Sequence, residues 1–121
     1  MRHLASLALV GLVSSTLAAA DADPDLPKKA IAIFETSCIK CHGPEKQRGE
    51  LRLDSAEALA KGGENGPVVV PGKPEESKLI TGVKREGDED YHMPPKAKDA
   101  LPPDQVKILV DWVAAGAKWP E

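Results

Sequence analysis

The residues best suited to chemistry form one short motif, Cys38-Ile39-Lys40-Cys41-His42. Each thiol can add to one vinyl group of a porphyrin, and the two intervening residues let one helical turn present both sulfurs to the same edge of the ring. His42 can then place its imidazole on the iron from below the plane. Because this spacing is the attachment signal for c-type haem, we predict one covalently attached haem c that is bound by Cys38, Cys41 and His42.

The cysteine pair has two other interpretations, a structural or redox disulfide and a metal site. A thioredoxin-like redox site is expected within a βαβ unit, and no strand-like run surrounds this pair. A zinc site needs further Cys or His ligands, and only His92 is left to offer one. The adjacent histidine and an export signal in the same chain favour haem over both alternatives.

The export signal is the N-terminal segment. A basic start at Arg2 is followed by an apolar run from Leu4 to Leu17, which is shorter than the roughly 20 residues that a membrane-spanning helix needs. Three alanines, residues 18–20, form a small-residue cleavage site. We therefore predict a signal peptide at 1–20, cleavage after Ala20 (or, as a second choice, after Ala22), and one monohaem domain at 21–121. An uncleaved anchor is the alternative.

Export agrees with the haem prediction, because bacteria attach haem c outside the cytoplasmic membrane, and it predicts a periplasmic or otherwise exported protein. Removal of the signal takes away Arg2 and no acid, so the net charge changes from −3 to −4. That sign argues against a nucleic-acid partner and is compatible with a soluble redox partner that carries a basic patch. We expect no stable membrane insertion after cleavage.

Apolar periodicity and capping residues predict four helices, at 27–38, 56–61, 74–83 and from Pro102 to just before Gly116. The last helix is apolar enough to need a partner, and we expect the first helix there, with Phe34 and Trp112 at the contact. Residues 68–70, between Gly-Pro and Pro-Gly, are expected to be extended and to lie against the haem. One Phe, one Tyr and two Trp make a thin core, which a haem would enlarge.

The sixth iron ligand has two candidates, Met93 and its neighbour His92. Met93 lies in a Met-Pro-Pro sequence, whose rigid prolines can hold a loop against the iron. Ligation by Met and His raises the reduction potential relative to two histidines. We therefore predict His42 and Met93 as the axial pair. His92 is the alternative sixth ligand. Met93 could instead be an ordinary core residue without a role in ligation.

These residues resemble the class I cytochromes c, and most closely the planctomycete-type cytochrome c domain. Ala30 and Phe34, eight and four residues before the first cysteine, match a small residue and an aromatic of that family, although the small residue is commonly Gly. Most of 30–120 is covered by tracts similar to the planctomycete-type domain: Arg48–Ser55, Lys61–Pro67, Val70–Ser77 and Met93–Pro95, the last followed by a Trp-bearing helix. The chain departs from the pattern at Pro102-Pro103, where a Ser-type cap is usual.

The resemblance implies an all-α class I cytochrome c fold, in which the N- and C-terminal helices cross and short helices and loops wrap around one haem. It implies a one-electron carrier rather than an enzyme, serving redox partner proteins. A haem enzyme or gas-binding sensor is the alternative from another class, and it would need an open or labile sixth site and a distal acid–base group such as His92.

Overall fold

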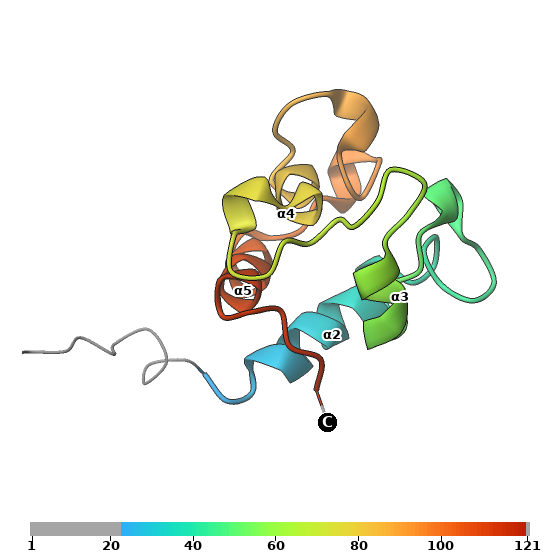
Figure 1. Ribbon diagram of the computed structural model, residues 1–121. Coiled ribbons are helices and arrows are strands. Elements are labelled where there is room, and N and C mark those ends of the chain that lie inside the picture. Colours follow the sequence, from blue (N-terminus) through green and yellow to red (C-terminus); the bar gives the residue numbers. More distant parts are fainter. Residues whose placement is uncertain (1–22, 121) are drawn as a thin grey trace, which may run out of the picture.

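The computed structural model describes residues 23–120, so the predicted signal peptide at 1–20 lies outside the described residues. Residues 23–120 form four α-helices and no strand, which confirms the all-α prediction (Figure 1). No helix in this part of the chain is long and apolar enough to cross a membrane. The helices are α2 (Leu26–Ser37), α3 (Ala56–Lys61), α4 (Lys78–Val83) and α5 (Pro103–Ala114). Four single turns of 3₁₀ helix lie between them: Arg48–Glu50, Pro74–Glu76, Glu89–Tyr91 and Ala97–Asp99.

The first and last of these helices, α2 and α5, pack against each other. Their contact is centred on Phe34 and Trp112, whose ring centroids lie 5.4 Å apart with an interplanar angle of 88°. This edge-to-face arrangement is the one that aromatic pairs prefer. Ala30 is completely buried one turn before Phe34, so a small side chain does lie in the interface. The predicted pairing of Phe34 with Trp112 is therefore confirmed.

The apolar residues of α2 are buried to different extents. Ile31 and Cys38 are only half-buried, whereas Ile33 is 5% exposed. The core-facing residues of α2 are Leu26, Ala30, Ile33 and Phe34. Ile31 and Cys38 are partly buried and pack against this core cluster.

Truncating Trp112 to Ala should lower the free energy of unfolding by about 3–5 kcal/mol, because a large core ring would be replaced by a cavity. Trp112 is 1% exposed, and its indole nitrogen donates to the Lys118 carbonyl at 2.9 Å. Chemical denaturation followed by circular dichroism gives the value. Trp119, which is half-buried near the end of the described chain, is the matched control, and its truncation should cost less. A change below about 0.5 kcal/mol for Trp112 would contradict the pairing.

The ends of α5 follow from residues recognisable in the sequence. Pro103 takes the first helical position and Pro102 the N-cap, which makes no side-chain bond. At the other end, Gly116 adopts φ +111°, a left-handed conformation that suits glycine. The amides of Gly116 and Ala117 donate to the carbonyls of Val113 and Trp112 at 3.0 and 2.8 Å. This is the Schellman arrangement, so Gly116 ends the helix as predicted.

The predicted helix at 74–83 is wrong in one respect, because it is broken at Ser77. Pro74–Glu76 is a separate 3₁₀ turn, and Ser77 has an extended backbone with φ −91° and ψ 118°. The Ser77 hydroxyl is buried, accepts from the Val70 amide at 2.9 Å and donates to the Lys73 carbonyl at 2.9 Å. These bonds tie the 68–73 segment to the start of α4, and they outweigh helix continuation.

The short helix α3 begins as predicted, since the Ser55 hydroxyl caps it by accepting from the Ala58 amide at 3.1 Å. Residues 68–70 contain no strand, also as predicted. Val69 is 8% exposed and Val70 is 37% exposed. The Leu79 amide donates to the Val68 carbonyl at 2.9 Å, so this segment lies against α4.

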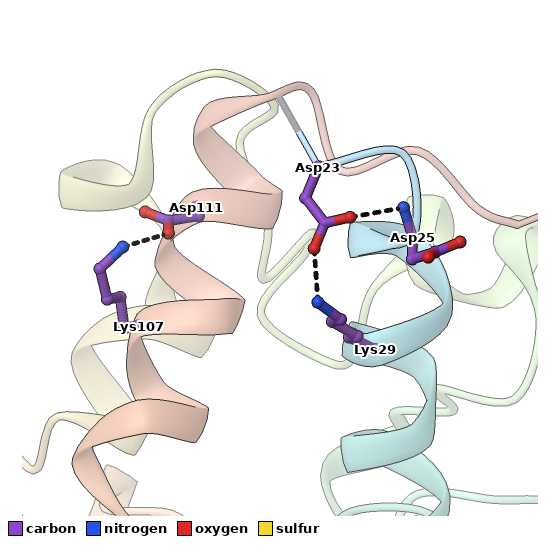
Figure 2. Close-up of polar contacts among 5 residues, drawn as sticks. All are labelled: Asp23, Asp25, Lys29, Lys107 and Asp111. Carbon is purple, nitrogen blue, oxygen red and sulfur yellow. Dashed lines mark hydrogen bonds and ion pairs between the residues drawn. The ribbon is translucent and has the colours of Figure 1, made fainter. Parts of the chain in front are cut away.

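Exposed ion pairs lie at the start of α2 and along α5 (Figure 2). Asp23 bonds the Lys29 ammonium at 2.5 Å and also accepts from the Asp25 amide at 2.9 Å, just before α2. The hydrogen bond from Lys29 lowers the pKa of Asp23. Lys107 and Asp111 pair at 2.6 Å along α5. Exposed pairs of this kind add little to stability, so the helix contact depends on its apolar side chains.

Candidate functional site

Cys38, Cys41 and His42 lie together on one turn directly after α2. The Cys38 amide still donates to the Phe34 carbonyl at 2.9 Å, which continues the helical pattern past Ser37. The amides of Cys41 and His42 then both donate to the Cys38 carbonyl, at 3.2 and 3.0 Å. Both thiols are free and half-buried. One helical turn therefore carries the two sulfurs and the imidazole, as the spacing requires.

Gly43 allows this turn to close on itself. The residue is buried, and a Cβ atom there would lie 2.5 Å from the Ile39 carbonyl oxygen and 2.7 Å from its Cγ2 atom. Those distances leave no room for a side chain. The Gly43 amide then donates to the Lys46 carbonyl at 2.8 Å and reverses the chain.

The orientation of His42 is fixed by a backbone group. Its Nδ1 lies 3.0 Å from the Arg48 carbonyl oxygen. A carbonyl only accepts hydrogen bonds, so Nδ1 carries the proton and Nε2 keeps a lone pair for a metal. Burial, the largest effect, lowers the pKa of His42 and favours the neutral imidazole that ligation needs. This partner could not be predicted from the sequence, because every residue type has a backbone carbonyl.

The thiol chemistry disfavours a redox disulfide. Burial raises the pKa of Cys38 to about 12, so its thiol stays protonated at neutral pH. Redox-active Cys-x-x-Cys sites need the opposite, a lowered pKa that supplies thiolate. Within residues 23–120, no group of three or more His, Cys, Asp or Glu side chains is placed to hold a metal ion.

Met93 lies on a separate loop that is anchored to α4. Its amide donates to the Gly82 carbonyl at 3.0 Å. Gly82 is buried, and a Cβ atom there would lie 2.8 Å from the Tyr91 carbonyl oxygen and 4.0 Å from the Cβ and Cγ atoms of Met93. The loop thus packs directly on the α4 backbone, where only glycine leaves enough space.

Arg85, just beyond the end of α4, makes the other contacts to this loop. Its guanidinium donates to the Pro94 carbonyl at 2.6 Å and to the Pro95 carbonyl at 3.4 Å. The role of Arg85 was not evident from the sequence, because Arg85 lies in a charged stretch typical of exposed loops. Gly82 was not evident either, because it occupies an ordinary position within a helical pattern.

His92 points its ring at another backbone group. Its Nε2 lies 3.1 Å from the Gly87 carbonyl oxygen, so this nitrogen acts as a hydrogen-bond donor. An Nε2 that carries a proton has no lone pair for iron, so only Nδ1 of this ring keeps one. His92 is thus held within its own loop, and among residues 23–120 no hydrogen bond to the Met93 sulfur is found.

Two surface hollows of about 120 and 170 Å³ are lined by none of the four predicted binding residues. The larger lies beside Trp112 and the start of α2, and the smaller between α3 and Trp119. The residues that could hold haem are therefore identified by their chemistry. Two free thiols and a neutral imidazole with a free Nε2 on one turn match the requirements of haem c.

One comparison with known proteins found a related family. A family model described as Planctomycete cytochrome C matches residues 38–97, a stretch that begins at Cys38 and ends just after the Met93-Pro94-Pro95 loop. The curated proteins and the solved structures gave no match. The matched stretch contains all four predicted binding residues and implies a c-type cytochrome with haem c. Over residues 38–97, the chain matches the planctomycete cytochrome C family that its sequence resembles.

Proposed function

We propose that this protein is an exported monohaem c-type cytochrome that carries one electron, with His42 and Met93 as the axial ligands. The observation that carries the proposal is the turn after α2, where two free thiols accompany an imidazole whose Nδ1 is 3.0 Å from the Arg48 carbonyl. When bound, haem supplies the one-electron couple of its iron. The chain supplies two thioether bonds, a proximal nitrogen and a sulfur ligand.

The choice of Met93 over His92 is supported by their hydrogen bonds. Ligation by His92 through Nε2 would require this nitrogen to leave the Gly87 carbonyl, which lies at 3.1 Å, so only Nδ1, the ring nitrogen nearer the backbone, keeps a lone pair. Met93 is held by its backbone amide, a hydrogen bond that does not involve its sulfur. A Met/His pair fills both axial positions, so no position is left for a substrate, and the protein is not an enzyme.

The fold and location complete the proposal. We assign residues 21–121 to one domain, in which α2 and α5 cross and the shorter helices and loops wrap around the haem. Residues 1–20 would be the export signal, and the mature protein would work in the periplasm or outside the cell. Its negative charge suits a redox partner with a basic docking face.

Visible spectroscopy tests this function directly. Protein made together with haem-maturation machinery should retain one haem per chain after acidic acetone extraction and give a sharp low-spin spectrum when reduced. Carbon monoxide should leave the spectrum of the reduced protein unchanged, because both axial positions are filled. Rapid binding of carbon monoxide would favour the haem enzyme or gas sensor instead. A colourless protein that still unfolds cooperatively would exclude both.

A further inference from the structure

The segment after Met93 has backbone hydrogen-bond acceptors but lacks backbone donors at two successive residues. Pro94 and Pro95 have no amide hydrogen, so this part of the loop can be held through its carbonyl oxygens but not through its own N–H groups. The carbonyls of both residues are bonded by one side chain, that of Arg85, at 2.6 and 3.4 Å. A planar guanidinium has several donors in a fixed fork and can bind two neighbouring oxygens at once.

Arg85 has an unusual backbone conformation at the end of α4. α4 ends at Val83, and Arg85 has φ +59°, in the left-handed region that non-glycine residues rarely adopt. Its amide donates to the Gly82 carbonyl at 3.1 Å, and the Gly82 carbonyl also accepts from the Met93 amide at 3.0 Å. The end of α4 therefore holds both sides of the loop, Met93 through Gly82 and the prolines through Arg85.

The charges nearby do not explain the position of Arg85. Four carboxylates follow it within five residues, those of Glu86, Asp88, Glu89 and Asp90, and all four residues are exposed. The ion pairs found within 23–120 do not include Arg85. Its half-buried guanidinium makes hydrogen bonds to the loop carbonyls instead.

We propose that Arg85 is the positioning residue for the Met93 ligand: by fixing the Pro94 and Pro95 carbonyls, it sets how firmly the Met93 sulfur is presented. This inference rests on the proposed function, in which Met93 is the axial ligand. Without the guanidinium the loop loses its carbonyl anchors, and the state in which the sulfur is withdrawn becomes more populated. An external ligand that binds only this withdrawn state then binds more tightly, in proportion to its population.

The test measures binding of imidazole to the oxidised, haem-loaded protein. Arg85→Gly removes the guanidinium and suits the left-handed backbone, so it separates loop anchoring from backbone strain. This variant loses the hydrogen bonds from the charged guanidinium to the loop carbonyls. It should therefore bind imidazole about tenfold more tightly than wild type, or tighter still. The far-red band of sulfur ligation should weaken. Arg85→Lys, which can reach one carbonyl but lacks the fork, should give an intermediate affinity, and it remains informative if the glycine variant does not fold.

Lys84→Ala is the matched control, because it removes an adjacent exposed cation and should leave imidazole affinity within about twofold of wild type. If Arg85→Gly and Arg85→Lys both retain the wild-type band and affinity while Met93→Ala loses the band, Met93 is the ligand and the role of Arg85 is refuted. If Met93→Ala has the same spectrum and imidazole affinity as wild type, the proposed ligation fails and this inference fails with it.

Discussion

Replacing both Cys38 and Cys41 with alanine should yield a protein without covalent haem and without a cooperative unfolding transition. The described core has only two fully buried aromatic rings, Phe34 and Trp112, while Tyr91 is 63% exposed. A domain of this size with so few large buried side chains is marginally stable without a prosthetic group or a disulfide. We expect complete loss of haem from the extracted chain and near-complete loss of helical circular dichroism at 37 °C.

The controls separate attachment from folding. Lys40→Ala changes an exposed residue between the two cysteines and should keep both haem and stability. The single variants Cys38→Ala and Cys41→Ala each leave one thiol and should retain one thioether bond. A double variant that lacks haem but melts cooperatively at the wild-type temperature would show that the apolar core is sufficient alone.

Met93→Ala should convert the closed iron site into one that binds carbon monoxide in a one-to-one complex. The far-red band of sulfur ligation should disappear, and the reduction potential should fall, because Met/His ligation raises it. His92→Ala should change neither property, since the His92 ring is bonded to the Gly87 carbonyl at 3.1 Å. Optical titration with carbon monoxide and a redox titration measure both effects.

These two variants form a matched pair, because the residues are adjacent and both are half-buried. The opposite pattern, in which His92→Ala loses the low-spin spectrum and Met93→Ala keeps it, would establish ligation by two histidines. The protein would then be a carrier of lower potential. If His92→Ala and Met93→Ala change the spectrum equally, the substitutions disturb the loop as a whole. The Arg85 variants test the anchoring of this loop without changing either candidate ligand.

Helix positions were predictable wherever the sequence contains a local stop or start signal. Ser55 caps α3, Pro103 begins α5 and Gly116 ends it, and each of these is a property of one residue and its immediate neighbours. The break at Ser77 was not predictable in this way. It depends on hydrogen bonds to Val70 and Lys73, and a serine in a helical pattern does not show which distant groups it will meet.

The candidate site also has a part that adjacent residues determine and a part that depends on distant contacts. The turn of Cys38, Cys41 and His42 could be predicted because its geometry follows from residues adjacent in sequence. The partners that orient the site, the Arg48 carbonyl and the Arg85 guanidinium, come from chain reversals that no residue pattern specifies. The identity of the sixth ligand depends on such partners, and for this reason the sequence left both Met93 and His92 as candidates.

The anchoring of the methionine loop also has a consequence for hydrogen exchange. Arg85 and its carbonyl partners are only nine and ten residues apart in the chain, whereas Phe34 and Trp112 join nearly opposite ends of the described sequence. Closing a short loop costs less chain entropy than closing a long one. We therefore expect the stretch from Glu86 to Pro95 to detach from the end of α4 and reattach while α2 and α5 stay paired. Its amides should exchange through an opening of lower free energy than the amides of α2 and α5.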